Sequence, residues 1–119
     1  MADIYRMARD LGAALARTDE YQSLKRANEA ADEDRPLVEV RNRLQGLEDR
    51  IEAALRSGRE PEDDVKEAYE AALSELQAMS VFQRVVAAQS NFEKVMYKVN
   101  QTVAEGINEG SHSRIIVSS

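Results

Sequence analysis

Apolar residues recur every three or four positions along most of the chain, the spacing that places side chains on one face of an α-helix. The first stripe predicts a helix over residues 3–17 with Asp3 as its N-cap. Thr18 and Asp19 then offer the cap of a second, alanine-rich helix that ends before Pro36. The stripes are Ile4, Ala8, Leu11 and Leu15 in the first helix, and Tyr21, Leu24, either Ala27 or Asn28, and Ala31 in the second.

The third segment has the clearest pattern, because its apolar residues are close to the heptad spacing of a coiled coil. Asp34 and Pro36 are placed to cap and open this helix, and Gly58 is placed to end it. Two pairs of opposite charge at i,i+4 spacing favour the helix further. The apolar residues are Leu37, Val40, Leu44, Leu47, Ile51 and Leu55, and the charged pairs are Glu39 with Arg43 and Glu52 with Arg56.

A fourth helix is predicted to open at Pro61, and Ser80 then either caps a last helix or marks a bend in a continuous one. The rhythm continues to Gly110, so residues 80–109 would form a rod of about 45 Å at roughly 1.5 Å per residue. Because a compact domain of this size has a radius of gyration near 13 Å, this helix should extend beyond its own bundle. The stripes are Val65, Tyr69, Ala72, Leu76 and Met79, then Phe82, Val85, Gln89, Phe92, Met96, Val99, Val103 and Ile107.

These patterns predict an all-α fold: an antiparallel bundle of four to five helices with a long C-terminal helix and coiled-coil-like packing. Residues 1–110 form a single helical domain in this interpretation. Residues 111–119 are short, serine-flanked and β-branched, and we expect a flexible C-terminal tail. Alternatively, the segment 115–117 docks into an apolar groove or pairs with its symmetry mate.

Composition limits the size of the core. The chain has 119 residues and 43% of them are hydrophobic, but 17 of these are alanine, which leaves 34 larger apolar side chains. That number suits one domain if the side chains are regularly spaced. With 32% charged residues, five glycines and two prolines, the composition favours a charged helical protein over a β-sandwich or an α/β enzyme.

The sequence contains few of the residue patterns that are typical of catalytic or metal-binding sites. Without cysteine, a disulfide, a thiolate zinc site, a cysteine nucleophile and an iron–sulfur cluster held by this chain alone are excluded. His112 is the single histidine, and no Glu-x-x-His motif of a di-iron bundle is present. The acidic run 62–64 is explained by a helix N-terminus. We therefore expect no catalytic residue, cofactor or metal, and a protein that is not an enzyme.

The net charge of −6 and the absence of a dense Lys/Arg run disfavour direct binding of nucleic acid or of anionic membranes. No window approaches the roughly 18 apolar residues that span a bilayer, and the first residues lack the pattern of a secretory signal. We expect a cytoplasmic protein.

The part of the last helix that extends beyond the bundle carries an apolar strip, which would be a liability in water. A second copy of the chain or another helical protein is the simplest cover, so we expect a homodimer or higher homo-oligomer and a protein partner of unknown identity. Gln89 lies on the seam, where it either sets the register between helices or lies at the solvent-exposed edge of the seam. The candidate interface residues are Gln89, Phe92, Val95, Met96, Val99, Val103 and Ile107.

The chain contains, in this order, the short motifs Glu20-Tyr21-x-x-Leu24-Lys25-x-Ala27, Asp34-x-Pro36, Gly58-x-x-Pro61 and Ala88-Gln89-x-x-Phe92. In their order and spacing, these motifs resemble the YlbF/YmcA family of small bacterial and archaeal helical proteins over roughly residues 3–109. The resemblance implies an all-α fold that oligomerises through long helices, and a regulatory adaptor role in competence, sporulation and biofilm formation. It also implies a complex linked to ribonuclease-dependent RNA processing, whose members are associated with iron–sulfur clusters bound through cysteines; this chain has none.

The sequence thus predicts a non-enzymatic helical interaction or regulatory adaptor protein that acts through homo-oligomerisation and partner binding. The alternative is a chaperone-like or structural coiled-coil module that binds clients through its apolar helix seams.

Overall fold

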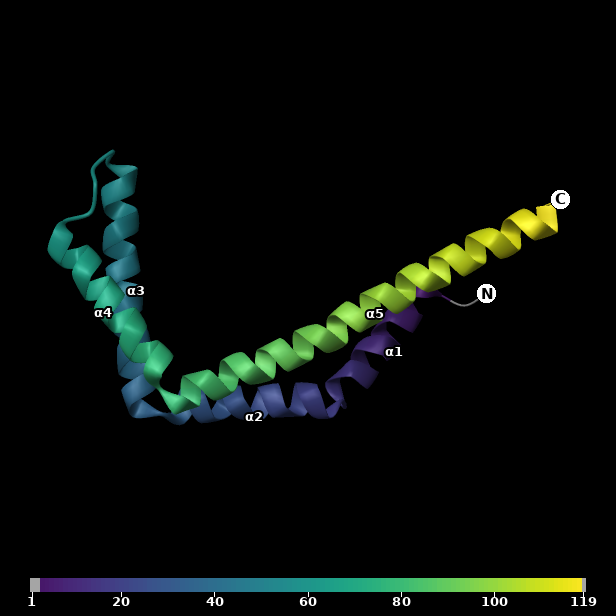
Figure 1. The fold of residues 1–119 in the computed structure, drawn as a ribbon, viewed down its shortest axis with the longest axis horizontal. Helices are drawn as coiled ribbons and strands as arrows, with labels where there is room; N and C mark the ends of the chain where they lie inside the picture. The colour runs from purple at the N-terminus through teal and green to yellow at the C-terminus, as the bar shows by residue number, and fades with distance from the viewer. Residues whose placement is uncertain (1–2, 119) are drawn as a thin grey trace.

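The computed structural model describes the backbone of residues 3–118 and the side chains of residues 3–112. This part of the chain contains five helices and no strand, which confirms the all-α fold and the long C-terminal helix (Figure 1). The helices are α1 (Ile4–Ala16), α2 (Asp19–Glu33), α3 (Arg35–Arg56), α4 (Asp63–Ala78) and α5 (Ser80–Ser118).

The helices pair into two arms that meet at a corner (Figure 1). One arm is the antiparallel hairpin of α3 and α4, and the other pairs α2 with the first part of α5, again antiparallel. Helix α1 precedes α2 at the far end of the second arm. The radius of gyration is 21.9 Å and the longest extent 69 Å, whereas a compact domain of this length has a radius of gyration near 13 Å. Much of the chain is therefore far from the corner.

Three predicted N-caps are present, and each satisfies a backbone N–H that the helix leaves without a partner. The Tyr5 N–H donates to Asp3 Oδ1 at 3.0 Å, and the Leu37 N–H donates to Asp34 Oδ1 at 3.0 Å. At the start of α2, the Tyr21 N–H donates to Thr18 Oγ1 at 3.2 Å. Asp34 also ends α2, so one residue both closes that helix and opens α3.

The α3–α4 hairpin turns at Gly58, as predicted. Gly58 has a φ of +73°, and the Arg59 N–H donates to the Ala54 carbonyl at 2.9 Å, which is the Schellman arrangement of a helix C-terminus. The start of α4 differs from the prediction, because Pro61 lies before the N-cap residue Glu62 and not in the first turn. The acidic residues of that turn are Asp63 and Asp64, where the helix dipole favours negative charge.

Helices α4 and α5 are two helices and not one rod. The break falls on Met79, whose ψ of 128° is extended, while Ser80 is already the first residue of α5. The side chain of Gln83 reaches back across the break and donates from Nε2 to the Gln77 carbonyl at 3.0 Å. The chain therefore changes direction sharply at Met79, as it does at Asp34 between α2 and α3, and the two breaks together make the corner of Figure 1.

The core lies between α3 and α4 and at the corner. The predicted stripe of α3 forms its centre: Leu37 and Val40 are fully buried, and Leu44 and Leu47 nearly so. The stripe fails at its end, because Leu55 is exposed where the chain leaves α3 for the turn. Around this centre pack Val65, Tyr69, Leu73, Met79, Val81, Phe82 and Val85.

Alanine forms much of the remaining core. Ala27 and Ala31 of α2 are buried, as is Ala88 of α5; Ala27 and Ala88 line one hollow between the two helices, and Ala31 belongs to the core cluster around Leu37. Small side chains let two helix backbones approach closely, and the close contact supplies dispersion energy in place of large side chains. Ala27 is buried and Asn28 is exposed, which settles the face of α2 that the sequence left open.

In the part of the chain that the structure describes, the ion pairs lie at the surface. Arg56 binds Glu52, as the spacing predicts, but Arg43 binds Glu75 of α4 at 2.9 Å and not its predicted partner Glu39. Each side chain of the Arg43–Glu75 pair is about half exposed, so its contribution is about 0–1 kcal/mol.

Helix α5 continues through Gly110, where the sequence predicted an end, and its backbone is helical to Ser118. The side chains of segment 115–117 lie outside the described residues, so docking of this segment stays a prediction. The division into a domain of residues 1–110 and a flexible tail of 111–119 likewise stays a prediction.

Candidate interaction surface

The candidate residues lie along α5, and four of them, Phe92, Val95, Met96 and Val99, are partly covered. Phe92 contacts Tyr21 of α2, with ring centroids 5.3 Å apart and planes inclined by 64°. Val95, Met96 and Val99 are half-buried. These four side chains are thus partly used within the chain.

Beyond the start of α2, the strip on α5 has little cover. Val103 is 50% exposed and Ile107 is 69% exposed. In Figure 1 the far part of α5 projects away from the corner, beyond the N-terminal end of α2. The extension of the last helix beyond its own packing is therefore confirmed, and its apolar residues face solvent in the single chain.

Gln89 does not lie in the contact between α2 and α5. Its side chain is exposed, and Nε2 donates to Glu93 Oε1 at 3.3 Å, while the adjacent Ala88 is buried. Within one chain Gln89 therefore lies at the solvent-exposed edge of the seam. Its role in setting the register between chains stays a prediction.

Sequence reasoning missed a second exposed strip, on α1. The predicted helix and stripe are present, but Ile4 is 68%, Met7 58% and Leu11 40% exposed, and α1 has no buried residue. Helical spacing predicts that these residues share one face, but it does not distinguish a face that packs inside one chain from a face that packs against another.

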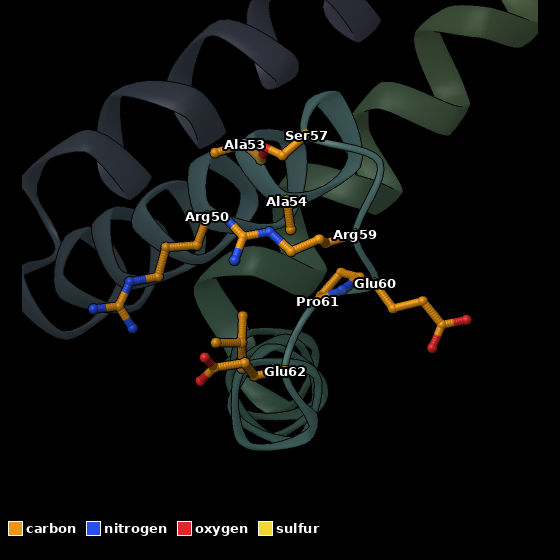
Figure 2. Close-up of a pocket in the computed structure, with 9 residues that line it drawn as sticks. Arg50, Ala53, Ala54, Ser57, Arg59, Glu60, Pro61 and Glu62 are labelled. Carbon is orange, nitrogen blue, oxygen red and sulfur yellow. The ribbon is translucent and has the colours of Figure 1, made fainter.

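An open hollow of about 540 Å³ lies at the tip of the other arm, where α3 turns into α4. Figure 2 shows Arg59 directed over Ala54, while Arg50 and Glu60 point outward on opposite sides. Arg50 and Glu60 therefore do not converge on one point in this hollow, as the groups of a catalytic site do.

Within the described residues, no group of three or more His, Cys, Asp or Glu side chains gathers in a way that could hold a metal ion. Across the same part of the chain, no helix combines the length and the apolar character needed to cross a bilayer. The geometry thus singles out apolar surface on α1 and the distal half of α5.

Comparison with known proteins agrees with this architecture. The family model described as "Control of competence regulator ComK, YlbF/YmcA" matches residues 4–108. The chain belongs to the YlbF/YmcA family. This membership confirms the resemblance seen in the sequence motifs and places the chain in a family named for regulation.

Among solved structures, a protein of unknown function (DUF964) from Bacillus stearothermophilus has a similar fold. The TM-score is 0.63 at 21% identity, over 89% of this chain and 93% of that one. No curated protein matches this sequence. Because of the low identity, the structural likeness shows that the two share a fold, and the family assignment rests on the model match.

Proposed function

We propose that this YlbF/YmcA family member is a non-enzymatic helical regulatory adaptor that acts through homo-oligomerisation and the binding of a protein partner. The observation that carries the proposal is the exposed apolar strip on the distal part of α5, beyond Val99, which contains Val103 and Ile107. A strip of this kind on a long helix is typical of helix-to-helix recognition.

The chemistry of the surface supports a protein partner. The strip itself contains valine, methionine and isoleucine, and the chain has no dense Lys/Arg run that would bind phosphates. We place the protein in the cytoplasm as part of the same proposal, and expect no direct binding of nucleic acid or membrane. In a family named for control of a competence regulator, regulation through protein contacts follows naturally.

Sedimentation equilibrium of the wild type and of Val103→Glu tests the proposal. The wild type should sediment as a dimer or larger oligomer, and the glutamate should raise the dissociation constant at least about tenfold, or 1.4 kcal/mol, because it places a charge in an apolar contact. Leu55→Glu is the matched control, since Leu55 is also apolar and exposed but lies at the tip of the other arm.

A wild-type protein that remains a monomer would overturn the oligomeric part of the proposal. Affinity purification from the native host tests the partner. One protein recovered in fixed stoichiometry, and lost with Val103→Glu, supports an adaptor. A varied set of unfolded proteins would instead favour the chaperone-like alternative.

A further inference from the structure

An open hollow of about 480 Å³ lies between α2 and the first part of α5. Two arginines line it, Arg26 from α2 and Arg84 from α5, together with the polar residues Ser23 and Asn91 and three alanines. The arginines are 58 positions apart in the sequence and reach one hollow because the two helices pack together (Figure 1). No local pattern in the sequence indicates this pair.

The hollow contains positive charge and no negative charge, since none of the residues that line it is acidic. The hollow at the tip of α3 and α4 also has two arginines, but Glu60 and Glu62 line it with them. A neighbouring hollow at the start of α2 has one lysine and two carboxylates. The hollow of Arg26 and Arg84 thus has an excess of two cations, in a chain whose net charge is −6.

Neither arginine is neutralised by a nearby carboxylate. In the part of the chain that the structure describes, the ion pairs involve three other arginines. Arg84 is the single charged residue between Glu75 and Glu93, so α5 has no acid within one turn of it on either side. Glu29 is one turn from Arg26 on α2, but it does not line the hollow and forms no ion pair with Arg26. Both guanidinium groups are exposed and available to an anion from solution.

The other residues of the hollow suit an anion with several oxygen atoms. Ser23 Oγ accepts from Arg26 Nη2 at 3.4 Å, which leaves its own proton to donate, and the Asn91 amide can donate as well. A phosphate group has a charge of about −1.5 to −2 at pH 7 and three acceptor oxygens, so it can balance two guanidinium groups and accept these further hydrogen bonds. A carboxylate has one charge and would leave one arginine unbalanced.

We propose that the hollow between α2 and α5 binds a phosphate group, either as the free ion or as the monoester group of a small molecule, and that Arg26 and Arg84 hold it. The hollow is larger than a phosphate ion, and its alanines leave room for the rest of a monoester. A single phosphate site is not the extended basic groove that a nucleic acid requires. The inference is independent of the proposed function, because the site is built within one chain.

Titration with inorganic phosphate, followed by ¹H–¹⁵N NMR, tests the site. The resonances of residues around the hollow, with the Asn91 side-chain amide among them, should shift and saturate with a dissociation constant of about 1–10 mM. Sodium chloride at the same ionic strength should not reproduce these shifts. Phenyl phosphate distinguishes the two sources, because tighter binding than that of phosphate indicates a monoester and equal binding indicates the free ion.

Two kinds of variant assign the binding to this hollow. Arg26→Gln and Arg84→Gln should each raise the dissociation constant for phosphate at least about tenfold, because each removes one charge-assisted contact. Ala87→Leu should weaken binding too, because Ala87 is an exposed residue of the hollow and leucine fills the space without removing charge. Arg59→Gln, in the hollow at the tip of the other arm, is the matched control and should leave the constant unchanged.

The outcomes separate this inference from the proposed function. Helix content by circular dichroism should be unchanged in both glutamine variants, since Arg26 and Arg84 are exposed. Shifts that do not saturate, or that are the same in Arg84→Gln as in the wild type, would overturn the phosphate site and leave the proposed function standing. A wild type that binds phosphate but sediments as a monomer would overturn the oligomeric part of the proposed function and leave the phosphate site standing.

Discussion

Tyr21 of α2 and Phe92 of α5 meet edge to face, with ring centroids 5.3 Å apart. Tyr21 is in the first turn of α2, so this contact lies close to the point where the cover of α5 by α2 ends. The pair joins residues 71 positions apart in the sequence and holds the start of α2 against α5.

The aromatic contact should be measurable as a coupling between the two rings. In a double-mutant cycle of Tyr21→Ala and Phe92→Ala, we expect a coupling free energy of about 0.5–1.5 kcal/mol beyond the sum of the single effects. Urea unfolding at one fixed protein concentration gives the four values. Tyr97→Ala, an exposed tyrosine on the same helix, should change the free energy of unfolding by less than about 0.5 kcal/mol. Additive single mutants would contradict the contact.

The two glycines Gly58 and Gly46 should respond in opposite ways to alanine. Neither has a neighbouring atom within 4 Å of an added Cβ, so packing does not decide the outcome. Gly58→Ala should lower the free energy of unfolding by about 1–2 kcal/mol, because its φ is +73°. Gly46→Ala, in the interior of α3, should raise it by about 0.5–1 kcal/mol. Thermal unfolding of both variants checks the prediction, and equal signs would be evidence against it.

Enlarging the alanine contact between α2 and α5 should destabilise the arm. Ala27 is buried to 3% exposure, so Ala27→Leu should cost about 1–3 kcal/mol through overpacking. Ala71→Leu, at an exposed position of α4, is the matched control and should have an effect within about 0.5 kcal/mol. Chemical denaturation followed by circular dichroism measures both. A tolerated leucine at position 27 would mean that the helices are not closely packed there.

Local signals in the sequence predicted the helices well, because each is set by residues close together in the chain. The caps at Asp3, Thr18 and Asp34 and the turn at Gly58 need only neighbouring residues to act. What the sequence did not resolve was the break at Met79, since an extended methionine between two helical patterns has no local signature. The contact between α2 and α5 was also hard to predict, because alanine forms much of it and alanine does not mark a core as clearly as the larger apolar side chains do.

Of the two exposed apolar strips, the sequence predicted the one on α5 and not the one on α1. The uncovered strip around Val103 and Ile107 followed from the length of the last helix against the size of one domain. The strip of α1 did not, because its spacing is the same as that of Leu37 to Leu47, which is buried. Whether an amphipathic face is covered depends on the direction that the next helix takes. That direction is set at the corner, and the spacing of residues on the face does not reveal it.

Because the two arms are joined only through the extended residues Asp34 and Met79, a small rotation there moves the far end of α5 a long way. The 39 residues of α5 span about 58 Å at 1.5 Å per residue, so turning this arm by about 10° at the corner moves its far end by roughly 10 Å. A small repacking of Leu37, Met79 or Phe82 at the pivot would therefore appear as a large displacement at Ile107, where the chain presents its apolar surface.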